Sequence, residues 1–144
     1  ISSDSKSNGA VSWYVNPMGK LVLELNVNGK PIRYESAVAF RKDRLGRWMH
    51  VSTTFDPVSK MVTHYVNGRS FSREKIVTSV PLHFGSSLLG NFSKNSLVKY
   101  KRSMQGKIDE FVLFKEAFDE VAVRRLFEIG CPYEIPNAFG NFTP

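Results

Sequence analysis

The sequence predicts an all-β protein, a sandwich or barrel of short antiparallel strands with one helix near the C-terminal end. Three observations lead to this prediction. Apolar and polar residues alternate with a period of two in several short segments. Turn-forming pairs such as Asn-Gly and Asp-Pro separate those segments. Helical spacing of apolar residues occurs only once, after the predicted strands.

The alternation is clearest in residues 20–27, KLVLELNV. Every leucine there lies on one face, and the polar Glu24 and Asn26 lie on the other. Residues 48–55 and 61–67 alternate in the same way and are rich in β-branched and aromatic residues. Further strands are predicted at residues 11–15, 31–40, 69–77, 82–90 and 107–114.

The connectors indicate how these strands pair. Residues 27–30 read VNGK and residues 66–69 read VNGR, and Asn-Gly accommodates the two positive φ angles of a type I′ hairpin turn. Residues 56–60, DPVSK, predict a third hairpin, because proline presets the φ angle of a turn. The strands near 48–55, 61–67 and 69–77 should therefore form a continuous antiparallel meander.

The predicted helix covers residues 120–130. Asp119 is placed to cap its start, Val123, Leu126 and Phe127 recur at helical spacing, and Gly130 stands where a C-cap belongs. We expect this amphipathic helix to lie on the sheets. The polar residues 1–9 suggest a flexible start, and residues 132–144, with three prolines, suggest an extended tail.

Composition limits the class of protein. With 144 residues, 42% hydrophobic and 23% charged, the chain has the size and core of one soluble domain that needs no disulfide. Its single cysteine, Cys131, is expected to be a packed residue after the helix rather than a nucleophile. No stretch approaches the roughly 18 apolar residues of a membrane helix, so this segment is not expected to insert into a bilayer.

The formal charge of +7 raises the question of an anionic partner. Basic residues gather at 41–47, 69–75 and 94–107, and charge runs of this kind are usually solvated loops. Only residues 94–107 carry five basic residues without an acid, and Tyr100 is the sole aromatic among them. Nucleic-acid binding needs more interleaved aromatics, so no nucleic-acid partner is expected.

Residues 94–107 are better interpreted as a long surface loop at the rim of the fold, where binding is often located. Carbohydrate or protein is the expected ligand, and the positive charge favours an acidic glycan. The predicted ligand-binding residues are Asn91, Lys99, Tyr100, Lys101 and Arg102.

Neighbouring carboxylates in residues 106–114, GKIDEFVLF, suggest catalysis or metal binding. Adjacent residues of a strand point to opposite faces, so Asp109 and Glu110 cannot act together across one glycosidic bond. Glu110 shares a face with apolar residues and would need a partner if it were buried. The three histidines lie on separate predicted strands and do not have the spacing of a zinc site. Each is expected to be a sheet residue that bonds a neighbour through one ring nitrogen.

Four motifs in order resemble the laminin G-like, concanavalin A-like domains. They are GRWMHVSTTFD, HYVNGR, LHFG and GKIDEFVLFKEAFDEVAVRRLFEIG, within residues 46–130. The resemblance implies a jelly-roll β-sandwich and a calcium ion bound by Asp109, the alternative being that Asp109 bonds loop amides. No other cofactor is implied. A Phe-x-hydrophobic-x-x-Trp pattern usual at the start of these domains is missing, which suggests that the first strands are absent and a sheet edge is exposed.

The HYVNG hairpin, the LHFGSSLLGNFS segment and the RLFEIGCP ending resemble, more narrowly, the domains attached to FecR-type regulators of planctomycete bacteria. That resemblance implies a periplasmic or extracellular location, with a membrane anchor upstream of Ile1. The expected function is non-catalytic recognition of carbohydrate or protein within a larger membrane-anchored regulator. A structural spacer, or a homodimer formed through an exposed sheet edge, is the alternative, and a glycoside hydrolase is third.

Overall fold

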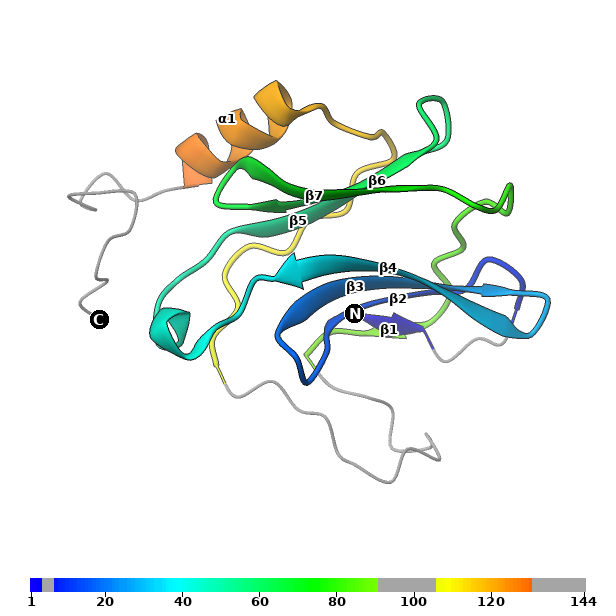
Figure 1. Cartoon of the computed structure of the whole chain (residues 1–144), viewed down its shortest axis with the longest axis horizontal. Coiled ribbons are helices and arrows are strands. Elements are labelled where there is room, and N and C mark those ends of the chain that lie inside the picture. Colours follow the sequence, from blue (N-terminus) through cyan, green and yellow to red (C-terminus); the bar gives the residue numbers. More distant parts are fainter. Residues whose placement is uncertain (4–6, 91–105, 131–144) are drawn as a thin grey trace.

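Figure 1 shows the chain in a computed structural model, which describes residues 1–3, 7–90 and 106–130. Three layers follow one another: a five-stranded sheet, a three-stranded sheet, and a helix on the far side of the three-stranded sheet. The paired strands of both sheets run antiparallel. The fold is therefore a β-sandwich with one short C-terminal helix, which confirms the predicted fold class.

The five-stranded sheet has the strand order β4-β3-β2-β1-β8. Strand β1 of this sheet is formed by the start of the chain, where the amino group of Ile1 donates a 2.8 Å hydrogen bond to the Trp13 carbonyl oxygen. The strands are β1 (Ser2–Ser3), β2 (Val11–Val15), β3 (Lys20–Val27), β4 (Lys30–Val38) and β8 (Ser87–Leu88).

The three-stranded sheet is a meander in the order β5-β6-β7, as predicted. It consists of β5 (Val51–Asp56), β6 (Met61–Val66) and β7 (Arg69–Lys75). Its turns follow the chemistry of the sequence. Asn67 and Gly68, like Asn28 and Gly29 in the first sheet, both have positive φ angles, which is the type I′ conformation.

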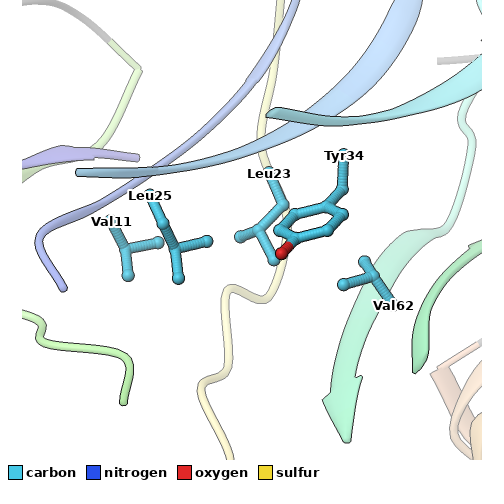
Figure 2. Packing of buried hydrophobic residues seen from close by; sticks show 5 residues of the cluster. All are labelled: Val11, Leu23, Leu25, Tyr34 and Val62. Carbon is cyan, nitrogen blue, oxygen red and sulfur yellow. The ribbon is translucent and has the colours of Figure 1, made fainter. Parts of the chain in front are cut away.

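The hydrophobic core fills the space between the two sheets. Val11, Leu23, Leu25 and Tyr34 extend from the five-stranded sheet toward Val62 of β6, as Figure 2 shows. Each of these side chains is at most 5% exposed. Burying one such side chain contributes about 1.5–3 kcal/mol. The period-two pattern of the sequence is thus the pattern of core contacts.

Helix α1 (Glu120–Gly130) begins where the sequence predicts. Asp119 caps it, because its Oδ1 accepts a 2.8 Å hydrogen bond from the backbone N–H of Ala122. Val123 is 2% exposed and faces the sheet. A Cβ atom added at Gly68 would lie 3.0 Å from the Cβ of Phe127, so the glycine of the β6–β7 turn also makes room for the helix.

Two predicted strands differ most from the structure. Residues 107–114 form no strand; every residue there is exposed, and Glu110 has a φ angle of +46°, which interrupts an extended run. Glu110 is therefore not a buried carboxylate on an apolar strand face. In residues 82–90, only Ser87 and Leu88 form a strand, and His83 makes an isolated parallel bridge with Ala10. The predicted tail, residues 132–144, lies outside the described residues, as does Cys131.

Candidate functional site

The ligand-binding residues predicted from the long basic loop are Asn91, Lys99, Tyr100, Lys101 and Arg102. All five fall within residues 91–105, outside the part of the chain that the structure describes. Their role in binding stays a prediction.

Asp109, the predicted calcium ligand, lies in the exposed segment that precedes the helix. Its acidic neighbour in sequence is Glu110. Across residues 1–3, 7–90 and 106–130, no group of three or more His, Cys, Asp or Glu side chains is arranged to hold a metal ion. Because calcium takes six to eight oxygen ligands, a site at Asp109 would depend on backbone carbonyls, water or residues outside those ranges.

Carboxylates on the solvent-facing side of the five-stranded sheet are paired with basic residues. Glu24 Oε2 accepts hydrogen bonds from Arg33 Nε at 2.5 Å and from the Tyr14 hydroxyl at 3.0 Å. Burial and the adjacent Glu24 carboxylate raise the pKa of Tyr14. Glu35 Oε2 lies 3.3 Å from Lys20 Nζ. Each of these two carboxylates therefore accepts hydrogen bonds from, or lies beside, a basic side chain of the same sheet.

A second surface is formed by residues 39–50, which connect β4 to β5 and so join the two sheets; we call this segment the rim loop. It contains a short 3₁₀ helix, η1 (Lys42–Arg44), visible at one end of the sandwich in Figure 1. Hydrogen bonds within the loop, from Arg44 N–H to the Arg41 carbonyl at 2.9 Å and from Leu45 N–H to the Lys42 carbonyl at 3.3 Å, shape its tip.

Both ends of the rim loop are fixed to neighbouring turns. The backbone N–H groups of Ala39 and Phe40 each donate a 2.9 Å hydrogen bond to the carbonyl oxygen of Gly19. A Cβ at Gly19 would lie 2.2 Å from the Phe40 carbonyl oxygen, so only glycine permits this approach. At the other end, His50 N–H donates to Asn67 Oδ1 at 3.1 Å, and Asn67 N–H donates to the His50 carbonyl at 2.8 Å.

The rim loop carries exposed cations and, directly after them in the sequence, a tryptophan. Arg41, Lys42 and Arg47 are exposed, and none of them forms an ion pair with an acid within the described residues. Trp48 is 41% exposed. The sequence analysis interpreted residues 41–47 as a solvated run, which agrees with their exposure, and it did not consider Trp48 together with them. The signal that could have found this surface is the tryptophan that directly follows the charges.

A buried polar chain holds the two sheets in one geometry beneath these surfaces. Trp13 Nε1 donates to Thr53 Oγ1 at 2.8 Å, Thr53 Oγ1 lies 2.8 Å from His64 Nδ1, and His64 Nε2 lies 3.2 Å from the Tyr34 carbonyl oxygen. A carbonyl oxygen can only accept, so Nε2 carries the proton and Nδ1 accepts from the Thr53 hydroxyl. Burial lowers the pKa of His64 to about 4, so the imidazole is neutral near pH 7.

His50 differs from His64, although both were predicted to be ordinary sheet residues. Its ring packs against Phe127 of α1, with centroids 5.7 Å apart, and burial lowers its pKa. Its buried Nδ1 has no hydrogen-bond partner within the described residues. His64, by contrast, uses both ring nitrogens. His50 thus acts as an apolar spacer between the sheet and the helix, next to the point where the rim loop is anchored.

Two antiparallel sheets packed face to face, with connecting loops at their ends, define a β-sandwich protein. Residues 1–124 match the family model described as the concanavalin A-like lectin/glucanases superfamily, in its laminin G-like form. The chain belongs to this family.

Other comparisons give little more. A search of curated proteins found no match. The crystal structure of an S-layer domain-containing protein (residues 221–444) from Clostridium thermocellum is 24% identical, with a TM-score of 0.49. The alignment covers 86% of this chain and 59% of that one, so the chain spans about three fifths of the solved structure. Within the described residues, no helix is both long and apolar enough to cross a lipid bilayer.

Proposed function

We propose that this domain is a non-catalytic recognition domain that binds carbohydrate outside the cytoplasm, and that the rim loop contributes to the binding surface. The observation that carries the proposal is Trp48, an aromatic residue with 41% of its surface exposed, on a loop whose two ends are hydrogen-bonded to the sandwich. A sugar ring has an apolar face of C–H groups that can pack on an aromatic ring. Membership of a superfamily of lectins and glucanases supports this ligand class.

A loop that is already ordered reduces the conformational entropy lost on binding. A loop that must be ordered on binding loses conformational freedom, which reduces affinity. The hydrogen bonds to Gly19 and Asn67 supply that order before the ligand arrives. The buried chain from Trp13 to Tyr34 keeps the two sheets, and hence both anchors, in a constant relation.

The carbohydrate proposal is tested by isothermal titration calorimetry against a panel of neutral and acidic polysaccharides. Trp48→Ala should weaken binding at least tenfold. The matched control is Phe84→Ala, because Phe84 is also exposed, at 37%, and follows the His83 bridge to Ala10, at the opposite end of β2 from the rim loop. Equal loss in both variants, or no polysaccharide bound by the native domain, would refute the proposal. Release of new reducing ends would instead support the alternative that the domain is a glycoside hydrolase.

The wider setting follows from the resemblance to domains of FecR-type regulators. We propose that the domain belongs to a larger membrane-anchored protein and acts on the periplasmic or extracellular side. Fractionation of cells that express the native gene with a tag tests this setting. Recovery of the tag in the cytoplasmic fraction alone would contradict it.

A homodimer through a sheet edge is a second candidate, and β5 is the edge that favours it. On β4, Pro31 and a register shift discourage pairing, and β7 carries Arg69, Arg73 and Lys75. β5 has no proline or bulge, and its one charged residue is Asp56. Thr54→Lys should then convert a dimer into a monomer in sedimentation experiments. A native domain that is monomeric at high concentration excludes this candidate.

A further inference from the structure

We propose that the rim loop binds anionic polysaccharide, with carboxylate or sulfate groups held by Arg41, Lys42 and Arg47 and an adjoining sugar ring on Trp48. This inference rests on the proposed carbohydrate recognition and names its ligand class. It starts from local charge. Residues 41–48 contain four basic residues and one acid, Asp43.

Four basic residues elsewhere on the described surface pair with acids, whereas others, such as Lys30 and Lys75, form no ion pair within the described residues. Arg33 pairs with Glu24, Lys20 with Glu35, Arg73 with Glu120, and Arg124 with Glu128, each at 3.3 Å or less. In the rim loop, Arg44 is turned back toward the Ala39 carbonyl oxygen at 3.4 Å, and the other three cations have no such acid within the described residues. Within the described residues, the rim loop thus carries three exposed cations that form no ion pair with an acid.

The types of side chain match an acidic glycan. The guanidinium group is a planar fork of donors that fits the paired oxygens of a carboxylate or sulfate. An acidic polysaccharide alternates such groups with sugar rings, which provide apolar faces for an indole ring. Nucleic acid is the competing polyanion, but a surface for single strands carries several aromatic rings for successive bases, whereas this loop presents one tryptophan.

The experiment measures binding of the whole chain to polygalacturonate, dextran sulfate, uncharged dextran and a single-stranded oligothymidine. Arg41→Gln with Arg47→Gln should weaken binding of the acidic polysaccharides roughly tenfold. The slope of log K against log salt should become shallower by roughly one for each cation removed. Unchanged melting temperatures establish that the variants fold, which is expected because both side chains are exposed.

A matched control removes two cations at the other end of the sandwich. Lys30 begins β4 and Lys75 ends β7, and the rim loop joins the opposite ends of these sheets. Lys30→Gln with Lys75→Gln lowers the net charge by the same amount and should change affinity less than twofold. An equal loss in this control would show that overall charge, not the rim loop, attracts the polymer, and it would overturn the inference.

The remaining outcomes separate the inference from the proposal beneath it. If uncharged dextran binds as well as the acidic polymers and only Trp48→Ala weakens it, carbohydrate recognition stands and the anionic specificity is refuted. If oligothymidine binds as tightly as polygalacturonate, the loop is a general polyanion surface and the inference is overturned. If no polysaccharide binds, both statements fall together.

Discussion

Lowering the pH from 7 to 5 should destabilise the folded domain through His64, which is completely buried. Burial lowers its pKa to about 4, whereas a histidine in an unfolded chain titrates near ~6.5. Between these values the unfolded chain binds a proton that the folded chain does not. The free energy of unfolding is therefore unaffected above pH 6.5 and falls as the pH falls, by about 2 kcal/mol at pH 5 and about 3 kcal/mol at pH 4.

Urea unfolding followed by tryptophan fluorescence measures this loss, and Trp13 is a suitable reporter because its indole belongs to the same hydrogen-bonded chain. The informative variant is His64→Gln, whose amide does not titrate and can still donate toward the Tyr34 carbonyl oxygen. It should be less stable than the native domain at pH 7, by about 1–2 kcal/mol for the altered hydrogen bonds. Its disadvantage should nearly vanish at pH 5.

The comparison between variant and native domain cancels the carboxylates, which titrate equally in both. His50→Gln serves as a comparison. Burial also lowers the pKa of His50, so protonation of this residue at low pH destabilises the folded domain in the same direction. If the native domain and His64→Gln lose the same stability between pH 7 and pH 5, the statement that His64 stays neutral in the folded domain is wrong.

Three further predictions concern the packing of α1, the buried hydrogen bonds of Thr53 and calcium binding by Asp109. Gly68→Ala should cost about 1–2 kcal/mol more than Gly29→Ala, because both glycines have positive φ but only Gly68 faces the helix; equal costs in urea unfolding would contradict this seating of α1. Thr53→Val should lower the free energy of unfolding by about 2–4 kcal/mol, because the Trp13 and His64 nitrogens lose their hydrogen-bond partner. A loss below about 1 kcal/mol would argue against the buried hydrogen-bonded chain. Calcium should raise the melting temperature of the native domain and not of Asp109→Asn if Asp109 is a ligand; equal shifts place the ion elsewhere.

The parts of the fold that the sequence predicts well are those decided by neighbours along the chain. Asn28-Gly29 and Asn67-Gly68 adopt the expected positive φ angles because the dipeptide itself tolerates them. Asp119 caps the helix because the backbone N–H that donates to its carboxylate belongs to Ala122, three residues further along the chain. The alternation in residues 20–27 likewise identifies which side chains enter the core, since strand geometry alone sends them to one face.

The parts that the sequence predicts poorly depend on distant partners. His64 uses both ring nitrogens because Thr53 and the Tyr34 carbonyl happen to flank it, and neither is a neighbour in sequence. The rim loop has the composition of a solvated charge run. It becomes a candidate site only because Gly19 and Asn67, on two separate turns, hold its ends. Whether residues 91–105 form the predicted binding loop is not tested by the described residues.

Residues 107–114, which precede the helix, allow the strand predicted from the sequence to be tested against the observed backbone conformation. Its alternation predicts a strand at 107–114, but a strand also needs a partner ladder, and Glu110 instead has a φ angle of +46°. A non-glycine residue in that region costs about 1 kcal/mol, which glycine avoids. Glu110→Gly should therefore leave stability unchanged or raise it by up to about 1 kcal/mol. In a paired strand the same change would cost about 1 kcal/mol, because glycine weakens strands. A clear destabilisation in urea unfolding, with Asp109→Gly destabilised equally, would restore the strand and refute the positive φ angle.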